Sequence, residues 1–153
     1  MSEKLLYVCM GNICRSPTAK GVFDHSLRRA EIAFHSESAG THGYHVGHRP
    51  DPRAIQAAAD AGIDISNDIA RQFAADDFHR FDRIFVMDRA NFEFVERLRP
   101  PDAGARLQLV MELAPDYGMQ EVPDPYYGGA EGFTRVIDML QAAARSLARE
   151  LGR

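Results

Sequence analysis

Apolar and polar residues follow one another along this chain in a pattern that predicts strands alternating with helices. Short apolar runs, typical of strands buried in a sheet, occur at residues 4–8, 83–87 and 106–110. A more polar candidate strand occupies residues 33–39 and is closed by Gly40. Because helical segments separate these strands, we expect them to pair in parallel.

Four segments have apolar residues at the spacing of a helix that lies on a sheet. The first begins after residue 17, and the second runs from Asp51 to about Ala61. The third extends from Asp88 to before Pro100, and the fourth covers residues 133–151. The apolar face of the first is predicted to comprise Val22, Phe23, Ser26 and Leu27, with Asp24, Arg28 and Arg29 elsewhere. Residues 115–132 have no period, which predicts a long loop that is either functional or mobile.

Together these elements predict an α/β fold, organised as a three-layer sandwich. A central four-stranded parallel sheet is expected to have helices on both faces and a phosphate-binding loop after its first strand. The length suits one domain, spanning residues 1–153. In such sheets ligands bind beyond the carboxyl ends of the strands, which is where Cys9 falls.

Composition narrows the class of protein without identifying it. Hydrophobic residues make up 45% and charged residues 26%, which is typical of a soluble globular protein. A net charge of −4 gives no indication of nucleic-acid binding. The first residues lack the apolar core of a signal peptide, and Leu5 to Val8 is too short to span a bilayer. Two cysteines in one loop do not form a secreted disulfide framework. We therefore expect a cytoplasmic monomer with no nucleic-acid or membrane partner.

The loop that starts at Cys9 has the features of an anion site. Successive N–H groups in a tight loop, together with the positive dipole end of the following helix, bind phosphate well. Gly11 lets the backbone approach a ligand, and Asn12 tolerates a left-handed turn. Cys9 would be a thiolate nucleophile, Arg15 a bidentate phosphate ligand and Ser16 a hydrogen-bond donor to the sulfur.

Simpler explanations exist for these residues. Cys9 would then be a small buried apolar residue and Arg15 a surface residue, because Cys-x5-Arg alone is a weak pattern. The preceding strand, the Gly-Asn pair and the Ser-Pro pair at the helix start favour a catalytic role instead.

His42, His45 and His48 fit no standard zinc spacing, so we expect a solvated loop there, and neither a metal nor a cofactor.

The segment Cys9-Met10-Gly11-Asn12-Ile13-Cys14-Arg15-Ser16-Pro17 resembles the signature of the low-molecular-weight protein tyrosine phosphatases. Further segments fall in that family's order and spacing: Ser38-Ala39-Gly40-Thr41, Pro50-Asp51-Pro52-Arg53-Ala54, Ala70-Arg71-Gln72, Val86-Met87-Asp88 and Asp124-Pro125-Tyr126-Tyr127-Gly128. The resemblance covers most of the chain. It implies a hydrolase that removes phosphate from phosphotyrosine in proteins, and from small aryl phosphates, through a phosphocysteine intermediate.

The same resemblance assigns the catalytic roles. Cys9 would be the nucleophile, Arg15 the phosphate clamp and Asp124 the general acid and base. From the residues alone, Asp124 before Pro125 would be explained as a turn. Phosphate is expected to bind Met10, Gly11, Asn12, Ile13, Cys14, Arg15 and Ser16.

Substrate selection is expected at the rim of the site, where Ile13, Tyr44, Tyr126 and Tyr127 match the family's pocket wall. A slot between apolar walls favours phosphotyrosine over phosphoserine. Loop packing is the alternative explanation for Tyr126 and Tyr127. Arginine-phosphate phosphatases of the family carry Thr where this chain has Ile13, which disfavours that branch.

Two further positions concern the loop itself. In the family, a cysteine placed like Cys14 can form a disulfide with the nucleophile and protect it from irreversible oxidation; the alternative is a small residue without a redox role. The chain departs from the family at Asp68, where many members have a His that braces the loop asparagine. We therefore expect Asn12 to be held by Ser16 and Ser38.

Two other functions use similar features. Arsenate reductases share the fold and the loop but pass oxidation to downstream cysteines, and this chain has none after Cys14. A phosphotyrosine-binding module without catalysis tends to lose the nucleophile or the acid, and both Cys9 and Asp124 are present. The sequence therefore favours the phosphatase.

Overall fold

The central sheet has four parallel strands in the order β2-β1-β3-β4, in a computed structural model that describes residues 2–152. Their bounds are Glu3–Cys9 (β1), Phe34–Gly40 (β2), Arg83–Val86 (β3) and Arg106–Leu109 (β4). β1 lies at the centre, where Val8 is in register with Ala39 on one side and Val86 on the other. The four predicted strands and their parallel pairing are thus confirmed.

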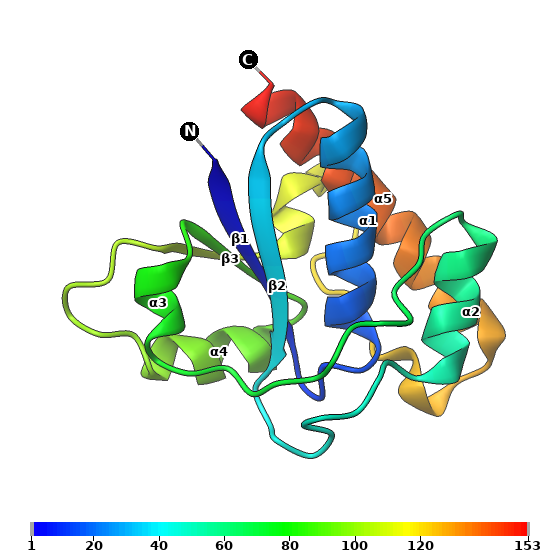
Figure 1. Cartoon of the computed structure of the whole chain (residues 1–153), viewed down its shortest axis with the longest axis horizontal. Coiled ribbons are helices and arrows are strands. Elements are labelled where there is room, and N and C mark those ends of the chain that lie inside the picture. The colour runs from blue at the N-terminus through cyan, green and yellow to red at the C-terminus, as the bar shows by residue number, and fades with distance from the viewer. Residues whose placement is uncertain (1, 153) are drawn as a thin grey trace.

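Helices cover both faces of this sheet (Figure 1). Their bounds are Arg15–Arg29 (α1), Pro52–Asp60 (α2), Asp77–Arg80 (α3), Arg89–Arg97 (α4) and Ala130–Leu151 (α5). α1 and α5 pack against each other on one face, with α2 beside them, and α4 packs on β3 and β4 from the other. This confirms the predicted three-layer α/β sandwich. No helix within residues 2–152 is both long and apolar enough to cross a membrane.

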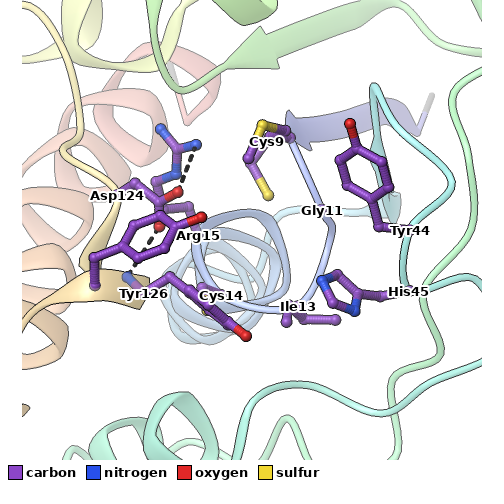
Figure 2. A pocket seen from close by; sticks show the side chains of 11 residues that line it. Cys9, Gly11, Ile13, Cys14, Arg15, Tyr44, His45, Asp124 and Tyr126 are labelled. Atoms are coloured by element: carbon purple, nitrogen blue, oxygen red, sulfur yellow. Dashed lines mark hydrogen bonds and ion pairs between the residues drawn. The ribbon is translucent and has the colours of Figure 1, made fainter.

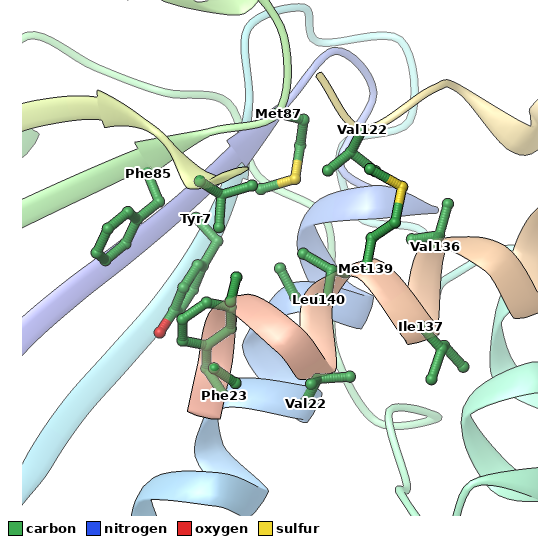
Figure 3. Packing of buried hydrophobic residues seen from close by; sticks show 14 of the residues in the cluster. Tyr7, Val22, Phe23, Phe85, Met87, Val122, Val136, Ile137, Met139 and Leu140 are labelled. Atoms are coloured by element: carbon green, nitrogen blue, oxygen red, sulfur yellow. The ribbon is translucent and has the colours of Figure 1, made fainter. Parts of the chain in front are cut away.

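Alternation of side chains along β1 divides the core into two clusters. Leu5 and Tyr7 belong to the larger cluster, under α1 and α5, whereas Leu6 and Val8 belong to the cluster on the opposite face. The rings of Tyr7 and Phe23 pack with centroids 4.9 Å apart in the larger one (Figure 3). This packing joins α1 to the sheet and so places the start of α1 at the carboxyl end of β1.

The structure corrects several element boundaries. The short helix α3 was not predicted, because its four residues are too few to show a period. The stretch 115–132 is less irregular than expected: it includes turns of 3₁₀ helix at Pro115–Tyr117 and Pro125–Tyr127 and the start of α5. The strand predicted at 106–110 ends at Leu109, because Val110 begins another 3₁₀ turn.

Asp24 is the clearest correction within a helix. The predicted apolar face excluded it, yet Asp24 is buried in the structure. Its carboxylate accepts hydrogen bonds from Ser36 (2.5 Å) and Lys20 (3.0 Å), which compensate for its loss of water. Ser36 belongs to the polar strand β2. The contact with the buried Asp24 carboxylate therefore explains why this strand has a polar residue at that position.

β2 also fixes the loop that follows β1. Thr41 N–H donates to the carbonyl of Cys9 (2.9 Å), and His42 N–H donates to that of Met10 (3.0 Å). At Gly40 the two backbones approach so closely that a Cβ would lie 2.8 Å from the Met10 carbonyl oxygen. A backbone atom cannot swing away as a side chain can, so only glycine fits at this position.

We therefore expect Gly40→Ala to lower the free energy of unfolding by about 1–3 kcal/mol, the usual cost of overpacking. The measurement is the urea midpoint at unchanged m-value. Gly104→Ala is the matched control, because a Cβ there meets nothing within 4 Å, and it should change stability very little. Equal midpoints for the two variants would contradict this account of the close approach.

Candidate active site

The segment 9–16, from the last residue of β1 into the first turn of α1, is here called the phosphate loop. Cys9 ends β1, Cys14 precedes the first turn of α1, and Arg15 begins that helix. Asn12 has a φ of 58°, the left-handed conformation expected for it. This turn directs the Asn12 N–H to the Cys9 Sγ, at 3.3 Å. The sulfur therefore lies inside a curl of backbone at a helix N-terminus, where an anion is stabilised.

Cys9 is 2% exposed, and its sulfur has a second polar neighbour. The Ser16 hydroxyl lies 3.1 Å from Sγ and can donate to it. Ser16 itself is fully buried, so its orientation is fixed by its surroundings. A thiolate at this position would have both a backbone and a hydroxyl donor.

The side chain of Asn12 is tied to three partners. Its amide nitrogen donates to Ser16 (2.6 Å) and to Ser38 (2.9 Å), the two serines expected from the sequence. Its amide oxygen accepts from the backbone N–H of Arg71 (3.0 Å), which the sequence did not suggest. These bonds are made without Asp68, which lies beside Ser38 and Lys20 in a neighbouring cavity. Burial raises the pKa of Asp68.

Arg15 is 3% exposed, and two hydrogen-bond acceptors orient its guanidinium. Its Nη1 donates to Asp88 Oδ2 (2.6 Å) and to the carbonyl of Val122 (3.0 Å). Burial disfavours the charge, but Cys9 and Asp88 outweigh it, so the pKa of Arg15 is raised above its ordinary value. The guanidinium is thus a permanent buried cation. Asp88 also caps α4, because its Oδ1 accepts a hydrogen bond from the Asn91 N–H.

Asp124 lies in residues 122–129, here called the acid loop. Val122 N–H donates to the carbonyl of Met87 at the end of β3 (2.9 Å), which anchors this loop to the sheet. The Asp124 carboxylate accepts from Tyr126 N–H (3.0 Å) and has an oxygen 3.9 Å from Nη2 of Arg15. It is partly exposed and therefore within reach of both substrate and water.

Arg53 holds the second half of the acid loop, residues 126–128, by hydrogen bonds. It donates to the carbonyls of Tyr126 (3.0 Å) and Gly128 (3.4 Å), and its guanidinium lies over the Tyr126 ring. Asp51, which caps α2, pairs with Arg53 at 3.0 Å. Neither residue was predicted to act at the site, although both fall in a segment that matched the family, and Asp51 was expected only to begin its helix.

These groups surround one cavity of about 250 Å³. It is lined by Cys9, Met10, Gly11, Ile13, Cys14, Arg15, Tyr44, His45, Asp124, Tyr126 and Tyr127. All three proposed catalytic residues and all four rim residues are therefore brought together, whereas Asn12 and Ser16, which were also expected to bind phosphate, do not line the cavity. Figure 2 shows Asp124 and Tyr126 on one side of Cys9, and Tyr44 and His45 on the opposite side.

Tyr44 is positioned by a stack of rings. Its ring lies 5.1 Å from that of His42, which in turn lies 5.5 Å from Phe94 of α4.

Among residues 2–152, no group of three or more metal-binding side chains has the geometry of a metal site. His45 was not predicted to line the cavity, because its position in an aperiodic loop gave no indication of its direction.

Cys14 is buried and, like Cys9, has a free thiol. Burial raises the pKa of the Cys14 thiol to about 12, with smaller contributions from Asp51, Cys9 and Asp124. At neutral pH this thiol is therefore protonated, and a protonated thiol is a poor nucleophile.

Comparison with known proteins supports the resemblance over the whole chain. The family model described as low molecular weight phosphotyrosine protein phosphatase matches residues 4–153. A low molecular weight phosphotyrosine protein phosphatase of Schizosaccharomyces pombe is 39% identical over 152 residues, which cover 95% of this chain and 97% of that one.

Solved structures show the same likeness. A protein tyrosine phosphatase of Entamoeba histolytica, with Hepes in its active site, superposes with a TM-score of 0.93 at 37% identity, covering 98% of this chain and 97% of that one. A Drosophila arginine phosphatase superposes with a TM-score of 0.91 at 28% identity, covering 96% of each. The chain belongs to the low molecular weight phosphotyrosine protein phosphatase family and is an enzyme of the protein-tyrosine-phosphatase class.

Proposed function

We propose that this phosphatase acts on tyrosine-phosphorylated proteins through a phosphocysteine on Cys9, with Arg15 as the phosphate clamp and Asp124 as the general acid and base. The observation that carries the proposal is the convergence of these three side chains on one cavity at the end of β1. We further propose that the enzyme works in the cytoplasm as a monomer, without a metal or cofactor.

In the first step, the Cys9 sulfur attacks phosphorus and the bond from phosphorus to the tyrosine oxygen breaks. Asp124 gives its proton to that oxygen, so tyrosine leaves as a neutral phenol. The Asn12 N–H, at 3.3 Å from Sγ, and the Ser16 hydroxyl, at 3.1 Å, support the thiolate before the attack. Ionised sulfur is the nucleophilic form.

In the second step, water attacks the phosphorus and the phosphorus–sulfur bond breaks. Asp124, now a carboxylate, takes the proton of this water, and inorganic phosphate is released. The Ser16 hydroxyl stabilises the departing thiolate, which restores the starting state of Cys9. The partial exposure of Asp124 suits this step, because its carboxylate must meet water.

Arg15 stabilises the phosphoryl group as charge develops on it. Only its Nη1 makes hydrogen bonds within residues 2–152, to Asp88 and Val122, so Nε and Nη2 remain for two phosphoryl oxygens. A lysine could not make this bidentate contact. Because Asp88 and Val122 hold the guanidinium before substrate arrives, little reorganisation is needed in the transition state.

The cavity favours an aromatic phosphate. Tyr44 and Tyr126 stand on opposite sides of Cys9, which leaves a slot for a phenyl ring whose phosphate reaches the loop (Figure 2). A phosphoserine is too short to place its phosphate there while its backbone stays outside. Ile13 also lines the cavity, and its apolar side chain supports phosphotyrosine over phosphoarginine.

Asp124→Asn should lower kcat for phenyl phosphate by about 10²–10⁴-fold, the usual contribution of a general acid. For a dinitrophenyl phosphate the loss should be much smaller, because that phenolate departs without a proton. KM should change little, since proton donation acts in the transition state. Asp116→Asn, at an exposed site, is the matched control. An equal loss for the two substrates would assign proton donation to another group.

Iodoacetate should alkylate Cys9 alone, because alkylation needs a thiolate and the Asn12 N–H and the Ser16 hydroxyl can donate to the Cys9 sulfur. Cys14, with its pKa raised to about 12, should react only in strongly alkaline solution. Inorganic phosphate should slow the labelling by occupying the loop. Peptide mass spectrometry locates the label, and Cys9→Ser should have neither label nor turnover. Labelling of Cys14 first, or no protection by phosphate, would contradict the nucleophile assignment.

Hydrogen peroxide should inactivate the enzyme reversibly. It oxidises the Cys9 thiolate to a sulfenic acid. The Cys14 thiol then attacks that sulfur, slowly at neutral pH because it is protonated, and its proton leaves with the hydroxyl group as water. The product is a disulfide that a thiol reductant can open. In Cys14→Ala the sulfenic acid has no such partner and is oxidised further, so the loss becomes permanent. The measurement is the activity recovered after reduction. Equal recovery by the two proteins would remove the redox role of Cys14.

A further inference from the structure

One wall of the cavity comes from a loop rich in histidine. The segment from Thr41 to Pro50, here called the histidine loop, carries His42, His45, His48 and Arg49 and contains neither Asp nor Glu. His45 is the residue of this group that lines the cavity. His45 has no part in the chemistry proposed above, so its position at the cavity is not explained by catalysis.

The imidazole of His45 lies directly beside the phosphate loop. A Cβ built on Gly11 would be 3.0 Å from Cδ2 and 3.7 Å from Nε2 of this ring. Figure 2 shows the ring next to Ile13 and Gly11, across the cavity from Asp124 and Tyr126. The ring is therefore close to the position of a bound phosphotyrosine but on the side away from the general acid.

The surroundings of His45 contain few opposing charges. On its own loop, the His48 ring lies 6.0 Å away, and the Arg49 guanidinium donates to the carbonyl of Ser66. The phosphate loop contributes the Cys9 sulfur, which the proposed phosphate would cover. Within residues 2–152, Asp124 is the only carboxylate that lines the cavity, and it lies opposite. An acidic group beside His45 would thus meet positive or neutral neighbours.

The rim also has the character of a surface that contacts a polypeptide. Tyr44 is 67% exposed and Tyr127 is 84% exposed, and Val46 and Tyr126 are exposed as well. Of these side chains, Tyr44, Tyr126 and Tyr127 line the cavity, with Tyr44 on one side of Cys9 and Tyr126 on the other (Figure 2). A phosphotyrosine that enters the slot must leave its neighbouring residues lying over this rim.

We propose that His45 is a specificity-determining residue that selects substrates with Asp or Glu next to the phosphotyrosine. The proposal rests on the proposed function, since it concerns substrates of the same site. A flanking carboxylate pairs with the imidazolium of His45, and His48 and Arg49 extend the favourable potential outward. Exposed ion pairs are weak, so the expected preference is about threefold to fivefold in kcat/KM.

The test uses pairs of phosphotyrosine peptides that differ in one residue, Glu or Gln, placed directly before or directly after the phosphotyrosine. kcat/KM is measured at about pH 5.5, which lies below the ordinary pKa of about 6.5 for a free imidazole. The wild type should prefer Glu about threefold to fivefold in at least one of the two positions. His45→Gln should bring this ratio close to one, and His45→Glu should invert it. Added salt should reduce the preference of the wild type.

The ratio is taken within each variant, so a partly unfolded sample does not change it, because both peptides meet the same active sites. His25→Gln is the matched control: this imidazole is exposed on α1 outside the cavity, and its removal should leave the ratio unchanged. A ratio of one in the wild type, or a ratio that survives in both His45 variants, would overturn the proposal.

The failure of this proposal is distinguishable from that of the proposed function. If the wild type hydrolyses phenyl phosphate and treats all the peptides alike, only the role of His45 falls. If it hydrolyses neither phenyl phosphate nor any peptide, the proposed function falls, and the role of His45 with it.

Discussion

The geometry of the site depends on one backbone conformation, that of Asn12. A left-handed residue other than glycine costs roughly 1–2 kcal/mol, so it persists only where other contacts compensate. Here the compensation is three hydrogen bonds, to Ser16, Ser38 and the backbone N–H of Arg71. At about 1 kcal/mol net for each bond, they outweigh the cost. Their donors and acceptors come from α1, from β2 and from the segment before α3, so the phosphate loop is set by the tertiary fold.

The Arg71 backbone is in turn fixed by a network of charges. Its guanidinium pairs with Asp77 and Glu37, each at 3.0 Å, and Arg80 joins the same two carboxylates. Asp77 is buried and also accepts from Ala74 N–H. This gives a physical reason for α3, a helix of one turn: it presents a buried carboxylate to the segment that supports Asn12. The amide oxygen of Asn12 is thus held by a backbone N–H whose position this network fixes.

The parts of the fold that were predictable from the sequence are those encoded locally. The buried strands, the left-handed Asn12 and the helix start at the phosphate loop follow from residue type and short spacing. The parts that were missed depend on contacts between distant segments. Asp24 can be buried only because β2 brings Ser36 to it, and α3 is too short to show a period. His45 lies at the cavity because hydrogen bonds to β1 and the phosphate loop fix the start of its own loop, which no local pattern reveals.

Asp88 links the side chain of Arg15 to the architecture of the molecule. One of its oxygens orients the Arg15 guanidinium, and the other caps α4 through Asn91 N–H. Asp88→Ala would therefore free the guanidinium and also weaken the first turn of a helix on the opposite face of the sheet. A serine at this position would keep an oxygen for the helix cap but lose the ion pair with Arg15. The residue types that satisfy both contacts at once are thus fewer than those that satisfy the cap alone.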